Sequence, residues 1–320
     1  MSMNIFEAGV AETATTREMN RLAQCRLCLS RERAPVLIKE GLPLVRCGGC
    51  GVVFADRSFS EEERKVHYAY YGRKKDDPAA VSLTQRRYGT LLNSFSSYRT
   101  KGRLLEVGCG RGYFLEVARA KGWRPVGTEL SAEACDEARS KGLEVVLGSV
   151  SELSLAPGTF EVVVLFEVVE HMEKPLQEMR ELFQLLRPGG LLYVTTPNFD
   201  SLTRRLLKGQ WRIIQPQHRF YFTGTTLHFL LRTAGFERKA LFSKNLSVGD
   251  WRLYWSWDRL RSPKTKSPKS LDETFRQKAA RRRDLQLLQF GANLFFRYFH
   301  CGDTLEAYYK KPTGLKGVPA

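Results

Sequence analysis

The chain has 320 residues, of which 42% are hydrophobic and 27% are charged, enough for one large core and a small satellite domain. No uncharged apolar run approaches the length of about 20 residues that a membrane span needs, and the first residues lack the pattern of a signal peptide, so we expect a cytoplasmic protein. The formal net charge of +17 points to an anionic partner such as nucleic acid, an acidic lipid surface or a phosphorylated substrate, unless it reflects only solubility and a basic tail.

Composition and pattern divide the chain into five parts. We expect a disordered leader, a small module with paired cysteines, an α/β domain, a basic aromatic helical insertion, and a final strand with a tail. These parts are predicted over residues 1–20, 21–75, 80–245, 246–303 and 304–320, respectively.

Paired cysteines mark the second part. Cys25 and Cys28 are spaced C-x2-C, and Cys47 and Cys50 repeat that spacing after eighteen intervening residues. Each pair can present two thiolates to one ion from a tight turn, and four thiolates complete the tetrahedral shell that Zn²⁺ prefers. The sequence therefore predicts a closed, structural zinc site in a zinc-ribbon-like module. The alternative is a redox pair. Cys135 and Cys301 are interpreted as packing thiols.

Short apolar runs alternate with helical patterns over residues 80–245, which is typical of a parallel sheet with helices on both faces. Glycines at 122, 142, 189 and 235 mark helix ends, and Pro188-Gly189-Gly190 predicts a break before a strand. Helices are expected near 112–121, 131–141, 174–186 and 224–234. Strands are expected at Arg103–Val107, Pro125–Glu129, Glu144–Leu147, Glu161–Phe166, Gly190–Thr195, Phe236–Phe242 and Thr304–Lys310.

The first of these strands leads into a glycine loop, G-x-G-x-G at Gly108, Gly110 and Gly112, followed by a helix pattern. Such a loop lets the backbone approach a ligand at the helix N-terminus, and a carboxylate at Glu129 can accept ribose hydroxyls. A nicotinamide dinucleotide site would want glycine where Tyr113 stands. Glu106, next to the loop, suits a cationic amino group better than a pyrophosphate. These features favour S-adenosylmethionine (SAM).

Several segments together resemble the class I SAM-dependent methyltransferases, in particular the branch with ubiquinone-type and bacterial polysaccharide-cluster O-methyltransferases. The matching segments are LLEVGCGRG (104–112), GTEL (127–130), FEVVVLFEVVEHMEKP (160–175), LLRPGGLLYVTTPN (185–198) and QHRFYFTGTTLHFLLRTAGF (217–236). The resemblance implies a Rossmann-like, seven-stranded, doubly wound sheet whose last strand is antiparallel.

The resemblance also implies roles for residues. Glu106 and the three loop glycines would line the methionine end of SAM, and Glu129 would hold the ribose. The family's adenine-binding acid falls at Ser149 here, so backbone groups near Val150, or the side chain of Glu152, would serve instead. Cys109, inside the loop, is interpreted as a small residue that fits, because methyl transfer from SAM needs no covalent enzyme intermediate.

The run FEVVEHM places Glu167, Glu170 and His171 at spacings that share one face of a helical turn. With His218 they form a candidate site for Mg²⁺ or another divalent metal that engages an acceptor hydroxyl, as the resemblance also implies. Without a metal, His171 or His218 could be the general base, with Glu170 in the same catalytic group. The alternative is simple packing beside SAM. The remaining histidines, His67, His228 and His300, are assigned structural roles.

The insertion is basic and aromatic. Ten basic residues and two acids lie between Arg259 and Arg283, and Leu285, Leu288, Ala292, Phe295 and Phe299 follow a helical repeat. This pattern fits helix packing on the core, a lid over a lipid-linked substrate or peripheral contact with an anionic membrane at the inner face. Nucleic acid fits less well.

Together these features predict a SAM-dependent methyltransferase that acts on a hydroxyl of a sugar or glycan precursor, or of a quinone-like or lipid-linked small molecule. Two alternatives stay open. An RNA 2′-O-methyltransferase would share the E-x-x-E-H…H pattern, and a non-catalytic SAM-binding scaffold would account for Ser149.

Overall fold

The structure is a computed structural model that describes residues 24–57, 60, 62–63, 77–153, 155–245, 294–296 and 298–314. The predicted leader and most of the predicted basic insertion, including its two prolines and the repeat from Leu285 to Ala292, lie outside these residues. The five predicted part boundaries stay predictions.

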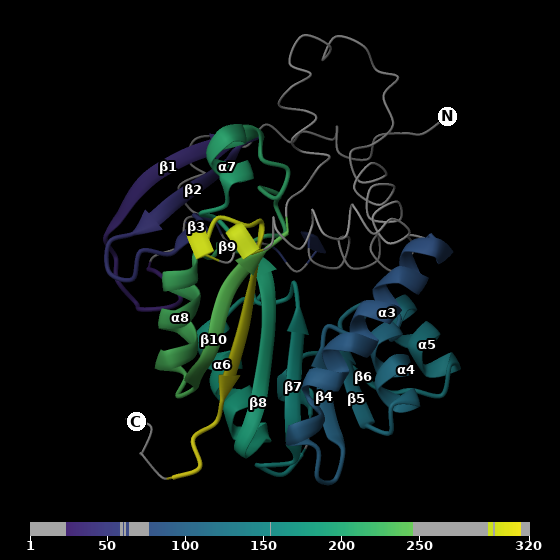
Figure 1. Cartoon of the computed structure of the whole chain (residues 1–320). Coiled ribbons are helices and arrows are strands. Elements are labelled where there is room, and N and C mark those ends of the chain that lie inside the picture. The colour runs from purple at the N-terminus through teal and green to yellow at the C-terminus, as the bar shows by residue number, and fades with distance from the viewer. Residues whose placement is uncertain are drawn as a thin grey trace.

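A seven-stranded sheet forms the centre of the molecule, in the order β10-β11-β8-β7-β4-β5-β6 (Figure 1). The inner strands pair in parallel, whereas β11 is antiparallel to both β8 and β10. This confirms the predicted Rossmann-like sheet and its antiparallel last strand. The strands are β4 (Arg103–Val107), β5 (Arg124–Glu129), β6 (Glu144–Leu147), β7 (Phe160–Phe166), β8 (Leu186–Pro197), β10 (Glu237–Lys244) and β11 (Thr304–Lys310).

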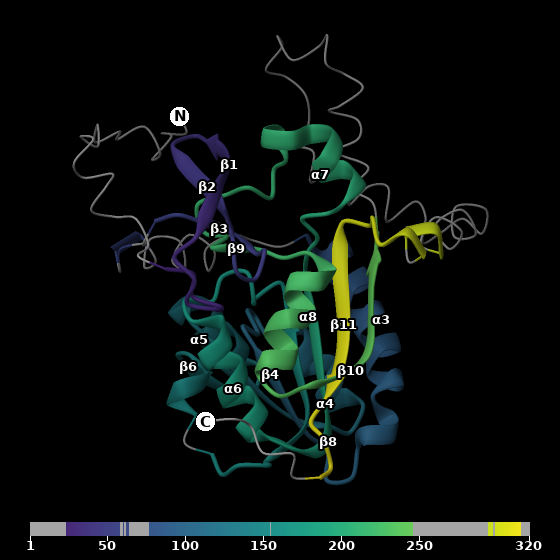
Figure 2. The same cartoon turned by 90° about the vertical axis from the view of Figure 1, so that its left-hand side faces the viewer.

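Helices cover both faces of this sheet and bury two apolar cores against it, because parallel strands need crossover helices on either side (Figures 1 and 2). One face carries α3 (Pro78–Ser94), α4 (Tyr113–Ala120) and α5 (Ala132–Ser140), and the other carries α6 (Pro175–Leu185) and α8 (Gly224–Thr233). Four of these helices were predicted within a few residues. The helix α3 was not predicted, although Asp77 caps it and Pro78 occupies its first turn.

The cysteine module forms a second sheet, and the catalytic domain contributes one strand to it. Its strands β1 (Arg33–Lys39), β2 (Leu42–Cys47) and β3 (Val53–Ala55) are antiparallel, and the fourth strand is β9 (Phe220–Tyr221). Phe54 and Phe220 pack beside core residues of the large sheet. The sequence suggested a separate satellite domain. In the structure the module instead shares a sheet and a core with the catalytic domain.

One predicted boundary is wrong. The sequence predicted a break at Pro188-Gly189-Gly190 before a strand, but β8 begins at Leu186 and runs through it. The pairing register with β7 shifts here, and Gly189 has a φ of 74°. The glycines allow the strand to bulge and continue, because a residue without Cβ tolerates this backbone.

Part of the predicted insertion is described close to β11. Residues 294–296 and 298–299 are helical, and Leu294, Phe295, Tyr298 and Phe299 are each at least half exposed, while Phe296 is buried. The predicted packing of Phe295 and Phe299 on the core is thus wrong among the described residues, whereas Phe296 is buried. Among the described helices, none is both long and apolar enough to cross a bilayer.

Because Phe54 joins the module to the main core, its truncation should destabilise the whole protein. We expect Phe54→Ala to lower the free energy of unfolding by about 3–5 kcal/mol in one cooperative urea transition, because the ring is 1% exposed and leaves a cavity. Ile38→Ala on β1, where the side chain is 75% exposed, is the control and should change stability by less than about 0.5 kcal/mol. Two separate transitions would contradict this shared core.

Candidate active site

The glycine loop lies between the end of β4 and the start of α4. Gly108, Gly110 and Gly112 have φ values of 68°, 52° and 79°, a region that favours glycine. A Cβ on Gly112 would lie 2.4 Å from Leu143 Cδ1, so the loop also needs the missing side chain for close packing. The three predicted loop glycines are thus explained by backbone conformation.

Glu129, at the end of β5, holds this loop from the neighbouring strand. Its Oε2 accepts a hydrogen bond from the Gly110 amide at 2.7 Å, and its Oε1 accepts from the amides of Leu130 and Ser131 at 2.8 Å each. A carboxylate has about four acceptor positions, so about one remains for a ribose hydroxyl in this arrangement. Glu129, the acid predicted to bind the ribose, therefore also stabilises the conformation of the glycine loop.

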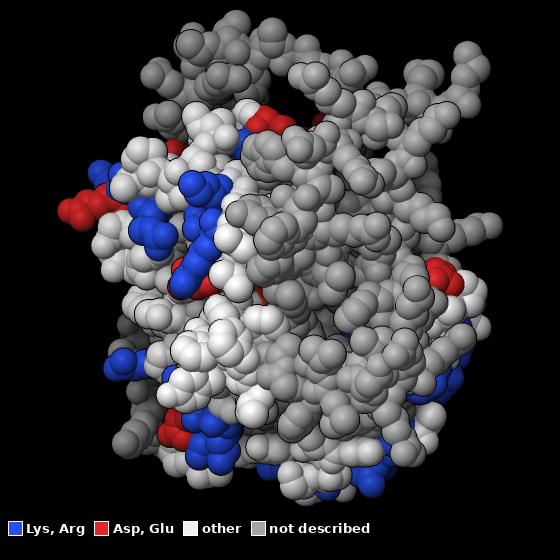
Figure 3. Space-filling view, turned by 45° about the horizontal axis from the view of Figure 1, so that its top comes forward, with Lys and Arg blue, Asp and Glu red and all other residues white. Residues whose placement is uncertain are grey.

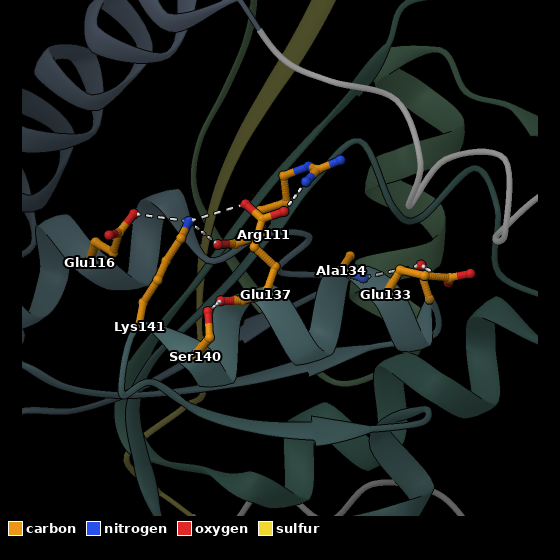
Figure 4. A network of polar contacts seen from close by, with 8 residues as sticks. Arg111, Glu116, Glu133, Ala134, Glu137, Ser140 and Lys141 are labelled. Atoms are coloured by element: carbon orange, nitrogen blue, oxygen red, sulfur yellow. Dashed lines mark hydrogen bonds and ion pairs between the residues drawn. The ribbon is translucent and has the colours of Figure 1, made fainter.

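A polar network fastens the same loop to α5 (Figure 4). Lys141 Nζ donates to the Arg111 carbonyl oxygen at 2.8 Å, lies 3.5 Å from Glu116 Oε2 and sits 4.4 Å from the centre of the Tyr113 ring. The Arg111 side chain pairs with Glu137 of α5. Sequence inspection missed Lys141, whose partners lie 25 or more residues away apart from Glu137.

Glu106 is a buried acid next to this loop. It is 4% exposed, and its Oε2 has no hydrogen-bond partner among the described residues. Burial, and then the charge of Glu129, raise the pKa of Glu106 well above its ordinary value. A buried acceptor of this kind is satisfied by a cationic donor, which agrees with the predicted contact to the amino group of a methionine moiety.

Ser149 begins a short turn after β6, as expected from its place in the Gly148-Ser149 pair. Its hydroxyl bonds Ser151 Oγ at 2.7 Å and donates to Glu152, whose carboxylate also accepts from the Ser149 amide. These bonds lower the pKa of Glu152. Val150 is buried. Because the Gly148 amide donates to the Glu129 carbonyl at 2.8 Å, this turn lies beside the predicted ribose acid.

Glu170, His171 and His218 form a compact group beyond the end of β7. Each offers one ligand atom, and these atoms all lie within 4.8 Å of one another. Glu170 is 1% exposed, and its Oε2 accepts from the Thr196 hydroxyl at 2.9 Å. Its Oε1 is buried, and no described residue donates a hydrogen bond to it. Burial, then Glu167, raise the pKa of Glu170. Thr196, from β8, was not identified from the sequence.

The two imidazoles of this group are in contact, with ring centres 4.6 Å apart. His171 Nδ1 lies 2.9 Å from the Gln217 carbonyl oxygen. A carbonyl only accepts, so Nδ1 carries the proton and the lone pair of the neutral ring is on Nε2. His171 therefore offers Nε2 as a ligand or as a base.

The helical turn expected around Glu167 takes another form. Residues 169–171 form a single turn, closed by the hydrogen bond from the His171 amide to the Val168 carbonyl at 2.9 Å. Glu167, just after the strand, has a φ of 55°, and its amide donates to the Thr195 carbonyl at 3.0 Å. Glu167 is absent from the compact ligand group. Its place as a metal ligand stays a prediction, and its charge acts on Glu170 nearby.

The four paired cysteines converge as predicted. Cys25 Sγ lies 3.7 Å from Cys50 Sγ, Cys28 Sγ lies 3.4 Å from Cys47 Sγ, and all four sulfurs lie within 4.8 Å of one another. These separations exclude disulfides, whose sulfurs are about 2.05 Å apart. They approach the spacing of about 3.8 Å between thiolates on a tetrahedral zinc ion. The residues therefore fit a four-thiolate metal site.

The cysteine module contacts the segment that follows Glu170 and His171, which together with His218 are called the acidic–histidine group below. Arg26, between Cys25 and Cys28, donates to Glu173 Oε1 at 3.0 Å and to its carbonyl oxygen at 3.2 Å. The Glu170 carbonyl accepts from the amides of Arg219 and Phe220, which lead into β9. The conformation of the module therefore influences the positions of Glu170 and His218.

Comparison with known proteins identifies the class. A family model described as a methyltransferase domain matches residues 81–240. That is half of the chain, so the chain belongs to this methyltransferase family, an enzyme class for which SAM is the methyl donor.

Individual relatives are consistent with this class. A "Probable S-adenosylmethionine-dependent methyltransferase" of Mycolicibacterium smegmatis is 33% identical over 144 residues, or 44% of this chain and 54% of that protein. A ubiquinone biosynthesis O-methyltransferase of Xanthomonas campestris pv. campestris is 35% identical over 103 residues, or 30% of this chain and 43% of that protein. The matches span about half of these relatives. A SAM-dependent methyltransferase structure from Archaeoglobus fulgidus is 19% identical with a TM-score of 0.48, covering 71% of this chain and 94% of that one.

The orphaned oxygen of Glu106 leads to a pH prediction. If the carboxylate receives the SAM amino group, binding must release the proton that the raised pKa retains on free Glu106, so affinity should rise with pH, by at most about tenfold per pH unit. Calorimetry in buffers of different ionisation enthalpy measures both affinity and released protons. Glu106→Gln should bind more weakly and release no proton at this site. Proton release that persists in Glu106→Gln would contradict the assignment.

Proposed function

We propose that this protein transfers the methyl group of SAM to a hydroxyl of a sugar or glycan precursor, or of a quinone-like or lipid-linked small molecule. The observation that carries this proposal is Glu170 Oε1, a buried acceptor without a partner, set beside His171 and His218. A hydroxyl needs help to become a nucleophile, and this group supplies the chemistry for it. The named O-methyltransferase relative adds support from the comparisons.

The proposed reaction needs alignment more than covalent chemistry, because the sulfonium already activates the methyl group. The S–CH₃ bond breaks as the O–CH₃ bond forms, S-adenosylhomocysteine leaves, and the hydroxyl proton passes to a base. Glu106 and the loop amides bind the methionine end, and Glu129 holds the ribose. His171 Nε2 is the proposed proton acceptor when no metal ion is bound, with His218 as its neighbour.

The same three side chains fit a divalent cation. Glu170 Oε1 supplies an anionic oxygen, and the two imidazoles supply nitrogens within 4.8 Å of it, a donor set that suits Mg²⁺ less than Mn²⁺ or Zn²⁺. When bound, such an ion lowers the pKa of a coordinated hydroxyl and fixes its direction. Thr196 orients the carboxylate by bonding its other oxygen.

The four-cysteine cluster is proposed to hold a structural zinc ion. Its sulfurs come from two turns that flank β1 and β2, and a four-thiolate site leaves no position for a substrate. Zinc would fix the turn that carries Arg26, and through Glu173 the segment after His171. The proposed role is to hold the module against the catalytic group.

An RNA 2′-O-methyltransferase would use the same acidic–histidine group, so that geometry does not discriminate the acceptors. Tritium transfer from labelled SAM into fractionated extracts distinguishes an RNA acceptor from a small-molecule acceptor. Label in small, nuclease-resistant material supports the proposal, whereas label lost after ribonuclease treatment overturns it. Absence of any transfer, with S-adenosylhomocysteine still bound, would favour the scaffold alternative.

Glu170 is the first residue to test. Glu170→Gln keeps the shape and the Thr196 contact but removes the charge, so we expect loss of Mn²⁺ binding by electron paramagnetic resonance and at least about a hundredfold loss of turnover. Affinity for S-adenosylhomocysteine should change less than about twofold, since SAM contacts are elsewhere. Glu181→Gln on α6 is the matched control. Wild-type turnover in EDTA would eliminate the metal role.

The zinc proposal predicts a distinct loss. Cys47→Ser should remove the zinc that metal analysis finds in the wild type and destabilise the module, because one of four thiolates is gone. Cys301→Ser, a buried thiol outside the cluster, should retain the metal. A wild-type protein that binds no zinc when refolded with it would refute the site.

A further inference from the structure

Three arginines from two distant segments share one surface where the cysteine module meets the catalytic domain. Arg46 lies on β2 next to Cys47, and Arg204 and Arg205 lie on α7 (Leu202–Leu207), the helix that follows β8. We call these three residues the arginine patch. Figure 3 shows basic side chains gathered on the face that carries β1, β2 and α7 at the top of Figure 1.

The patch concentrates like charge without neutralising it. No salt bridge joins any of its three side chains to an acidic side chain among the described residues, and Asp200 is the acid whose charge acts on Arg204. Burial, partly offset by Asp200 and reinforced by the charges of Arg46 and Arg205, lowers the pKa of Arg204. Holding these cations together costs free energy that a bound anion would recover.

Arg204 is also prepared for directional binding. Its guanidinium carbon lies 3.9 Å from the centre of the Phe199 ring, and its buried Nε has no hydrogen-bond partner in the part of the chain that the structure describes. Ser201 caps α7 by accepting from the Arg204 amide at 3.1 Å, which fixes the helix start. A planar guanidinium stacked in this way presents its fork of donors in one direction, as phosphate recognition requires.

The patch lies close to the acidic–histidine group. The Phe199 ring that supports Arg204 contacts the Tyr221 ring at 5.8 Å, and Tyr221 contacts the His218 ring at 6.3 Å. Two aromatic rings thus separate Arg204 from His218. Because both rings are buried, an acceptor bound at the patch would have to extend around them to reach the acidic–histidine group.

We propose that the arginine patch binds a phosphate or diphosphate group carried by the methyl acceptor. This inference rests on the proposed function and narrows its acceptor class. A nucleotide-linked sugar and a phosphate-linked lipid both carry the required group, whereas a neutral quinone-like phenol does not. The inference also gives part of the net charge of +17 a specific role.

Inorganic pyrophosphate is the first probe, titrated calorimetrically into the zinc-loaded full chain saturated with S-adenosylhomocysteine. Arg204→Gln and Arg46→Gln should each weaken pyrophosphate binding about tenfold, the loss of one charge-assisted contact. Arg232→Gln, which removes an exposed charge from α8, is the matched control and should leave the affinity unchanged. Arg205→Gln, also exposed, substitutes for any patch variant that does not fold.

Two further probes distinguish the source of the phosphate. Uridine diphosphate bound more tightly than pyrophosphate, with loss in Arg204→Gln, supports a nucleotide-linked acceptor. Binding to phosphatidylcholine vesicles only when they contain phosphatidic acid, with the same loss, supports a lipid-linked one. Equal affinity of the wild type and all patch variants overturns the inference, as does an equal loss in Arg232→Gln, or binding of an RNA oligomer but not pyrophosphate. Bound S-adenosylhomocysteine is measured in the same samples, so its absence refutes the proposed function separately.

Discussion

The parallel pairing of β4 between β5 and β7 is the constraint on which the site depends. Parallel neighbours bring their carboxyl ends to one edge, so Glu106 and Glu129 finish adjacent strands and the turn with Glu170 follows the third. The amides of Gly110, Leu130 and Ser131 then fix the Glu129 carboxylate. The glycine loop, Glu129 and the turn with Glu170 are thereby brought together by one sheet.

The cysteine module extends this assembly to a second sheet. Its strand β3 pairs with β9, which begins two residues after His218, and Arg26 reaches across to Glu173. The pairing of β3 with β9 joins only two pairs of residues, so this interface is small. Phe54 and Phe220 nevertheless connect the module to the main core, because both rings pack in it. The module is thus well placed to shape the acceptor side of the site, where enzymes that share a SAM-binding core must differ in order to accept different molecules.

Local patterns explain what could be predicted. The glycine loop, the helix caps and the cysteine pairs depend on residues a few positions apart, so they can be predicted from the spacing of residues in the sequence. The features that were missed depend on distant partners: β9 is two residues long and exists only by pairing with β3, and the Arg26–Glu173 contact spans 147 positions. The helix α3 was different, because Asp77 and Pro78 gave a local start signal. Glu167 was placed on a helical turn because spacing alone cannot show that the strand end imposes a positive φ.

The distribution of charge differs between the interior of the proposed site and the surface beside it. Inside, Glu106 and Glu170 each keep one buried oxygen without a partner, and burial raises the pKa of both carboxyls. The free-energy cost of burying such a carboxyl group is lowest when the group is protonated and neutral. A cation that displaces this proton can pair with the resulting carboxylate, so the interior favours positively charged ligands such as a methionine ammonium or a metal ion. On the surface, the charges of Arg46 and Arg205 act on Arg204, and among the described residues none of the three forms a salt bridge with an acidic side chain. A cationic methyl donor and an anionic acceptor would thus each find a surface of opposite charge, and repulsion would keep either from the other's place.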